Sequence, residues 1–149
     1  MYYFASDIHL GLQIGSDPEN RERLLVQWLD EVSKDADAIF LVGDIFDFWY
    51  EYRYVVPKGF TRLLGKLSEL TDRGIPVHFF GGNHDIWTYR YLHDECGVTL
   101  YHSPYAEFEL DGRKVIVGHG DMLGPRPAGQ RILSAIFRSR LLQWLFSIL

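Results

Sequence analysis

Residues 38–47, AIFLVGDIFD, decide the fold of this chain. The apolar run 38–42 has the length of a buried strand, and Gly43, Asp44 and Asp47 follow it directly. Ligands of open α/β sheets bind beyond the carboxyl ends of the strands, so polar side chains at such an end are candidates for a functional site. The stretch therefore predicts a buried parallel strand with a polar site at its end.

Three further polar clusters follow strand-like apolar runs in the same way. The runs 2–5, 77–80 and 114–117 precede, in that order, Asp7-Ile8-His9, Gly82-Asn83-His84-Asp85 and Gly118-His119-Gly120-Asp121. Because the carboxyl ends of parallel strands meet at one edge of a sheet, we expect the four clusters to converge on one point.

Helical stripes of apolar residues separate the first three strands. Residues 22–33 and 58–73 place leucines at helical spacing, with Pro18 in the first turn of one helix and Gly74 at the end of the other. A shorter helix is expected over 86–96. Later, Asp111-Gly112-Arg113 is a turn signal that predicts a β-hairpin of 106–110 with 114–117. The alternation of strands and helices predicts an α/β fold with a parallel sheet and right-handed crossovers.

The clusters carry the ligand types of a divalent-metal site. Carboxylate, imidazole and amide groups without a thiolate suit manganese, iron, zinc or magnesium. One carboxylate can hold two ions about 3.5–4 Å apart, and we assign this bridging role to Asp44. We expect the glycines of the clusters to let the backbone approach the ions. The predicted ligands are Asp7, His9, Asp44, Asn83 and His119, which together indicate a two-metal phosphoesterase site.

In their order, D-x-H, G-D-x-x-D, G-N-H-D and G-H, the clusters resemble the motifs of the calcineurin-like metallophosphoesterase superfamily. The resemblance covers essentially the whole chain. It implies a double-sheet sandwich flanked by helices (αββα), with the hairpin in the second sheet. It also implies a hydrolase with two divalent ions, for which we expect Mn²⁺. One ion would be held by Asp7, His9 and Asp44, and the other by Asp44, Asn83 and His119.

Four residues beside the ligands receive supporting roles. The family pattern implies that His84 contacts the phosphate and protonates the leaving oxygen. Asp85 and Asp121 are expected to orient the rings of His84 and His119, because metal-bound histidines usually donate their second N–H to a carboxylate or carbonyl. Asp47 is interpreted in the same way, with a turn-capping aspartate as the alternative.

Residues 43–49 and 118–121 are similar to the branch of this superfamily that cleaves the pyrophosphate bond of UDP-2,3-diacylglucosamine in lipid A biosynthesis. The products would be UMP and 2,3-diacylglucosamine 1-phosphate. This resemblance implies a cytoplasmic enzyme, peripheral on the inner membrane, without an obligate protein partner. Many members of the branch carry arginine at the position of His84. A metallophosphodiesterase on another nucleotide substrate, or an inactive half-site fragment, are the alternatives.

Two segments are candidates for contacts to such a substrate. The aromatic stretch 48–54 contains Trp49, which would line a substrate wall or pack in the core. Residues 125–149 combine arginines with large apolar residues, including Arg126, Phe137 and Leu141. We interpret this segment as the start of a helical lid that takes acyl chains, and an ordinary pair of core helices is the alternative.

The whole chain of 149 residues suits one domain. The superfamily's later Gly-His-x-His motif, which supplies one histidine to each ion, does not occur in this sequence, so we expect a C-terminally incomplete protein. The net charge of −5 gives no basic footprint for nucleic acid. Cys96 is the sole cysteine, which rules out an internal disulfide and fits a buried apolar role. We find no signal peptide and no apolar stretch near the roughly 20 residues of a membrane span.

Overall fold

A computed structural model describes residues 1–13, 18–52 and 54–121, together with residues 129, 136, 139, 141 and 143. Strands and helices alternate through the first hundred residues, and a hairpin follows. The elements are β1 (Tyr2–Ala5), α1 (Pro18–Val32), β2 (Ala38–Val42), α2 (Thr61–Asp72), β3 (Val77–Phe80), α3 (Tyr91–Cys96), β4 (Thr99–Tyr101), β5 (Ala106–Leu110) and β6 (Arg113–Val117).

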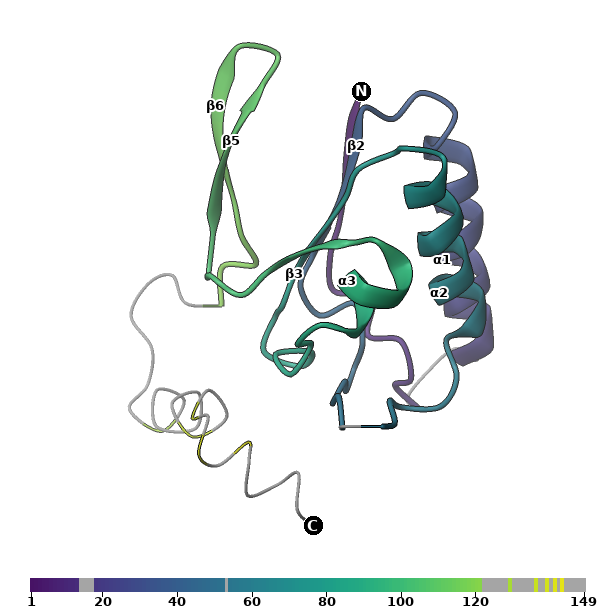
Figure 1. The fold of residues 1–149 in the computed structure, drawn as a ribbon, viewed down its shortest axis with the longest axis vertical. Helices are drawn as coiled ribbons and strands as arrows, with labels where there is room; N and C mark the ends of the chain where they lie inside the picture. Colours follow the sequence, from purple (N-terminus) through teal and green to yellow (C-terminus); the bar gives the residue numbers. More distant parts are fainter. Residues whose placement is uncertain are drawn as a thin grey trace.

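The first four strands form a parallel sheet in the order β1-β2-β3-β4. Figure 1 shows the three helices on one side of these strands and the hairpin β5–β6 on the other. The predicted α/β class and parallel sheet are confirmed. Strand β4 was not predicted, because its three residues are partly exposed and too few to produce a pattern.

Both faces of β2 are buried, which explains its continuous apolar sequence. Ile39 and Leu41 point toward the helices and pack in the core that contains Leu29 of α1 and Leu67 of α2. The alternate residue Phe40 faces the other way, into a second core beneath the hairpin. Its ring meets that of Phe108 in β5 edge to face, with centroids 5.0 Å apart. The two cores make three layers, with helices, parallel sheet and hairpin stacked in that order.

The hairpin forms at the predicted turn. Strands β5 and β6 pair antiparallel from Ala106 with Val117 to Leu110 with Arg113. The two residues between them, Asp111 and Gly112, have φ values of 50° and 72°. Two successive positive φ angles define a type I′ turn, whose twist matches that of the flanking strands.

The helix boundaries depend on contacts that the local sequence does not contain. Helix α1 begins at Pro18, as predicted. Helix α2 begins at Thr61 instead of residue 58, because Gly59 and Phe60 have positive φ. Its first amides, those of Arg62 and Leu63, donate to the buried Glu22 carboxylate of α1 over 2.9 and 3.0 Å. Helix α1 therefore caps the N-terminus of α2.

Helix α3 is shorter than predicted. It begins at Tyr91 rather than at residue 86, and the amides of Arg90 and Tyr91 donate to Glu51 over 2.7 and 3.0 Å. Residues 86–90 instead form the connection after β3, where Tyr50 and Trp87 make an isolated parallel bridge. The amide of Thr88 also donates to the Asp85 carbonyl over 3.3 Å, so these residues form a turn and a bridge and not the first turn of the helix.

Buried titratable groups outside the clusters have structural partners. His78 in β3 stacks on Phe40 and shares a hydrogen bond of 3.1 Å with the Tyr101 hydroxyl, and burial lowers the pKa of its ring. Cys96 is buried, and burial raises the pKa of its thiol. None of the helices among the described residues is long and apolar enough to cross a membrane.

Candidate metal centre

The clusters at residues 7–9 and 43–47 lie side by side because the chain continues to pair beyond the ends of β1 and β2. The amide of Asp7 donates to the Gly43 carbonyl (3.1 Å), and the amide of His9 donates to the Asp44 carbonyl (2.9 Å). Leu10 and Phe46 then form an isolated parallel bridge. Sheet pairing therefore carries Asp7 and His9 to the level of Asp44, as expected for strand ends at one edge.

Three of the predicted ligands have a left-handed backbone conformation. The φ angles are 55° at Asp7, 50° at His9 and 53° at Asp44. Such a conformation costs on the order of 1–3 kcal/mol for each non-glycine residue and persists only where the surroundings hold it. It turns these side chains out of the sheet direction and toward one another. Backbone strain is therefore concentrated at the polar cluster.

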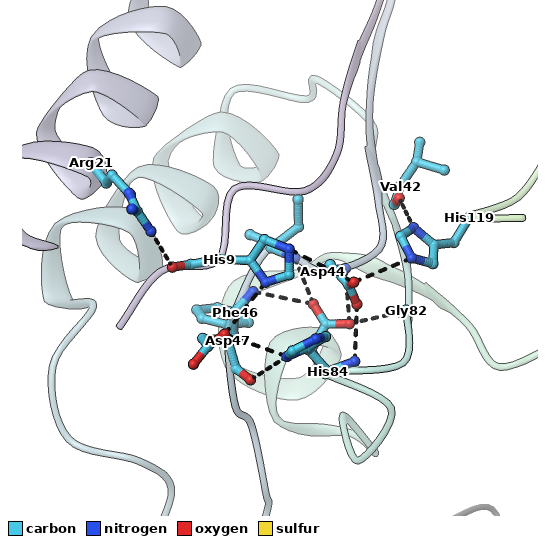
Figure 2. A network of polar contacts seen from close by, with 11 residues as sticks. His9, Arg21, Val42, Asp44, Phe46, Asp47, Gly82, His84 and His119 are labelled. Carbon is cyan, nitrogen blue, oxygen red and sulfur yellow. Dashed lines mark hydrogen bonds and ion pairs between the residues drawn. The ribbon is translucent and has the colours of Figure 1, made fainter. Parts of the chain in front are cut away.

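The carboxylate of Asp44 lies at the centre of the cluster (Figure 2). The residue is 4% exposed. Its Oδ1 accepts the amide N–H of His84 over 2.9 Å. Its Oδ2 faces Nε2 of His119 at 3.4 Å and Nε2 of His9 at 3.9 Å. Oδ1 is thus hydrogen-bonded to a backbone amide, whereas Oδ2 faces the imidazoles of His9 and His119, which follow different strands.

The hydrogen bonds of His119 show that this arrangement fits a metal ion. Its Nδ1 donates to the Val42 carbonyl over 3.0 Å, because a carbonyl can only accept. In the neutral ring the Nε2 lone pair then points at Asp44 Oδ2, so two electron-rich atoms face each other in a poorly hydrated site. A cation between them removes this repulsion, and a backbone carbonyl is a common partner for the second nitrogen of a metal-bound histidine.

Two groups of ligand atoms share Asp44. His9, Asp44 and His84 form one group, and Asp7, Asp44 and His119 form the other, with the ligand atoms of each group within 4.8 Å of one another. This supports the bridging role of Asp44. The grouping differs from the expected one, because Asp7 lies with His119 and His84 joins His9. The rings of His9 and His84 lie nearly perpendicular to each other, with centroids 4.7 Å apart.

Asn83 is exposed and lies between two anchored amides. The Gly82 amide donates to Asp85 over 2.7 Å and the His84 amide donates to Asp44 over 2.9 Å. The backbone is therefore held by Asp85 on one side of Asn83 and by Asp44 on the other, and the ligand role of Asn83 stays a prediction.

Asp47 lies between two histidine rings. Its carbonyl accepts from Nδ1 of His84 over 3.0 Å, and its Oδ1 is 3.4 Å from the same nitrogen. The same carboxylate oxygen is 3.5 Å from Nδ1 of His9. Asp47 thus lies beside the Nδ1 atoms of both rings, and the orienting role expected for it stays a prediction.

The role predicted for Asp85 is wrong. Its carboxylate is fully buried and accepts four backbone amides, those of Asp44, Ile45, Phe46 and Gly82, instead of contacting the ring of His84. The ring of His84 is instead hydrogen-bonded to the Asp47 carbonyl. Burial raises the pKa of the Asp85 carboxyl, while its amide donors oppose the shift. Asp121 is partly buried.

One residue near the centre was missed by the sequence analysis. Arg21 of α1 donates from its guanidinium to the His9 carbonyl over 3.1 Å. With Asp7 and the side chains of Leu24 and Trp28 it lines a cavity of about 490 Å³ between α1 and β1. No local pattern distinguishes this arginine from the other charged residues of an amphipathic helix.

The predicted substrate residues divide into three cases. Trp49 is fully buried in the main core and donates from its indole to Glu51 over 3.1 Å, which matches the core-packing alternative. Leu141 is 65% exposed. Arg126 and Phe137 lie outside the described residues. The Tyr50 hydroxyl donates over 2.8 Å to the carbonyl of Gln143, a described residue of the stretch predicted as the lid.

Gly82→Ala is expected to disrupt the centre. A β-carbon at this position would lie 2.1 Å from Oδ1 of Asp44 and 2.6 Å from its amide nitrogen, so the two loops must separate. We expect Mn²⁺ affinity, measured by calorimetric titration, to fall at least tenfold. Gly65→Ala is the matched control: a β-carbon there meets nothing within 4 Å, and the change should stabilise α2 by about 0.5–1 kcal/mol. Equal Mn²⁺ affinities in the two variants would contradict the close approach of the loops.

A buried carboxylate shared by two groups of side chains that could hold a metal ion, at the strand ends of an α/β fold, is the arrangement of a metal-binding domain. The profile of the calcineurin-like phosphoesterases matches residues 2–140, and the chain belongs to this family.

Curated relatives carry one name. A UDP-2,3-diacylglucosamine hydrolase of Porphyromonas gingivalis is 50% identical over 119 residues, which are 80% of this chain and 45% of that protein. A protein of the same name from Aeromonas salmonicida is 32% identical over 143 residues, 96% of this chain and 54% of its own length. The chain spans about half the length of the curated relatives it matches. A solved structure, of a protein of unknown function from Aquifex aeolicus, has a similar fold, with a TM-score of 0.51, 16% identity and coverage of 92% of this chain and 72% of that one.

Proposed function

We propose that this chain carries the metal centre of an enzyme that hydrolyses the pyrophosphate bond of UDP-2,3-diacylglucosamine, releasing UMP and 2,3-diacylglucosamine 1-phosphate in lipid A biosynthesis. The observation that carries the proposal is the Asp44 carboxylate, shared by two groups of ligands, in a chain 50% identical to a protein named UDP-2,3-diacylglucosamine hydrolase. Two adjacent metal positions suit the displacement of one phosphate group from another.

The cofactor in this proposal is a pair of divalent ions, with Mn²⁺ as the expected metal. Asp44 would be common to both, and Asp7, His9, Asn83 and His119 would complete the two ligand sets. When bound, such ions activate water and neutralise charge on a phosphoryl group. The left-handed backbone at Asp7, His9 and Asp44 holds the carboxylates and the imidazole in place before the ions arrive.

His84 is suited to the proton transfer that releases the leaving group. Its side chain is 41% exposed, so the ring is accessible to a substrate. Nδ1 is held by the Asp47 carbonyl, which leaves Nε2 as the nitrogen available to the substrate. The Asp47 carboxylate supplies a counter-charge for the ring while it holds two protons. The proton on Nε2 passes to the leaving phosphate oxygen, and Asp47 keeps the ring in the orientation needed for this transfer.

The proposed location is the cytoplasmic surface of the inner membrane. A diacylated substrate resides in a membrane, so an enzyme that acts on it needs apolar contacts at the surface. Ile136 and Leu141 are 44% and 65% exposed, and both lie in the segment that we interpret as the acyl lid. Gln143 of the same stretch accepts the Tyr50 hydroxyl over 2.8 Å, and Tyr50 follows Asp47 by three residues.

Product analysis tests the function directly. The chain is incubated with Mn²⁺ and UDP-2,3-diacylglucosamine in detergent micelles, and UMP is measured by chromatography. We expect UMP to appear only with the divalent metal. Cleavage of bis(p-nitrophenyl) phosphate without release of UMP would favour another nucleotide substrate. Binding of Mn²⁺ without either reaction would favour an inactive half-site.

Replacing Ile136 and Leu141 with serine should raise the KM for the diacylated substrate on the order of tenfold, since each buried methylene contributes about 0.8 kcal/mol. Hydrolysis of bis(p-nitrophenyl) phosphate should change less than twofold, because the metal ligands and His84 are untouched. Ile116→Ser, at a 67% exposed position on the hairpin, is the control. Equal losses on the two substrates would assign the segment to the core.

A further inference from the structure

The Asp85 carboxylate joins its own cluster, at residues 82–85, to the cluster at residues 43–47. It is fully buried. One oxygen accepts the amides of Gly82 (2.7 Å) and Asp44 (3.2 Å), and the other accepts those of Ile45 (2.8 Å) and Phe46 (3.3 Å). Three successive amides of one loop and one amide of another therefore converge on a single side chain.

Three successive amides that point to one side form a concave site for an anion. Here the first of the three amides belongs to Asp44, whose φ of 53° turns the chain so that the amides can converge. A left-handed aspartate is unfavourable on its own and needs contacts that hold it. The buried carboxylate of Asp85 supplies these contacts. It accepts hydrogen bonds from the amides of Asp44, Ile45 and Phe46, which follow the end of β2.

The two clusters hold each other, because each provides a carboxylate that accepts amides of the other. While Asp85 accepts the amides beside Asp44, the Asp44 carboxylate accepts the amide of His84 over 2.9 Å. The approach is close enough that a β-carbon on Gly82 would lie 2.1 Å from Asp44 Oδ1. Each cluster thus contributes a carboxylate that binds the backbone of the other. The position of the Asp44 carboxylate is fixed by this pair of contacts.

The hydrogen bonds of the Asp85 carboxylate go to backbone amides and not to the rings of His9, His84 or His119. The Nδ1 atoms of His84 and His119 are bonded to the carbonyls of Asp47 and Val42, and Nδ1 of His9 faces the Asp47 carboxylate. The amides that Asp85 binds belong to Asp44, the two residues after it, and Gly82. Its influence on metal binding therefore passes through the backbone at Asp44, which both groups of ligands share, and at Gly82, the neighbour of Asn83.

We propose that Asp85 is a positioning residue that sets the backbone of Asp44, so that its loss weakens both metal positions together. The inference rests on the metal-binding part of the proposed function and is independent of the substrate. It separates Asp85 from a residue that orients a single histidine, whose loss would weaken one position only.

Titration of the metal-free chain with Mn²⁺ tests this inference. In Asp85→Asn the side chain keeps its size, but one oxygen becomes a donor that opposes the amides, and we expect both Mn²⁺ affinities to fall 10–100-fold. Glu22→Gln is the matched control, because Glu22 is also buried and accepts two backbone amides, at α2 and away from the cluster. It should lower the melting temperature and change Mn²⁺ affinity less than twofold. His119→Ala should weaken one position more than the other.

Two results would overturn the inference: a folded Asp85→Asn variant with both affinities unchanged, or one in which a single position is weakened. Hydrogen exchange of the metal-free wild-type chain provides a test that needs no variant. The amides of Asp44, Ile45, Phe46 and Gly82 should all be strongly protected, and rapid exchange of these amides would also overturn it. Failure of the wild-type chain to bind Mn²⁺ would instead count against the proposed function, and the exchange experiment would still decide the role of Asp85.

Discussion

Asp44→Asn is expected to abolish binding of both ions and to lower kcat/KM for pyrophosphate hydrolysis at least about 10³-fold, because several kcal/mol of charge stabilisation depend on the ions. Asparagine tolerates the left-handed backbone at this position and retains an oxygen for the His84 amide, so the fold should survive. Metal analysis after dialysis against Mn²⁺, together with circular dichroism, separates loss of metal from loss of structure.

The control for this change is Asp72→Asn, at an exposed aspartate that ends α2 before the start of β3, whereas the clusters follow the ends of the strands. It should retain both ions and full activity. An Asp44→Asn variant that still holds two ions per chain would refute the bridging role, whatever its activity.

His84→Ala should lower kcat by about 10²–10⁴, the usual contribution of a general acid or base, while the Mn²⁺ content stays the same. The ring is partly exposed and is held by Asp47, which suits a group that meets the substrate. Because His84 also lies in a group of ligand atoms with His9 and Asp44, metal analysis is the deciding measurement. Loss of one ion in the variant would make His84 a ligand. His102→Ala, at an exposed histidine, is the control and should behave as wild type.

Much of the fold follows from the sequence because β2 and β3 are buried on both faces. Continuous apolar runs such as 38–42 and 77–80 have few alternatives once amphipathic helices lie between them, and the structure reproduces both boundaries. The convergence of Asp7, His9, Asp44 and His84 follows from the same argument, since parallel strands end at one edge. His119 was expected at that edge for the same reason, but it follows β6 of the antiparallel hairpin, which forms a separate sheet. The turn at Asp111 and Gly112 was predictable from the backbone preferences of those two residues.

The remaining features depend on contacts between residues far apart in the chain. The hydrogen bonds of Asp85 to the Asp44 loop join residues about forty positions apart, and no local pattern encodes them. The grouping of Asp7 with His119 depends on the left-handed turns at Asp7 and Asp44, which a sequence pattern does not reveal in residues other than glycine. Trp49 is a similar case, because an aromatic residue after a polar cluster can face either the core or a substrate.

The distribution of the ligands along the chain has a consequence for how the protein is made. His9, Asp44 and His84 are all translated before α3, whereas His119 follows the hairpin. The residues of the first group are therefore complete in the growing chain once residue 84 has been made, whereas the second group is complete only after β6, whose Val117 packs in one core with Phe40. A chain interrupted between α3 and β6 would contain every residue of the first group and would lack His119 of the second.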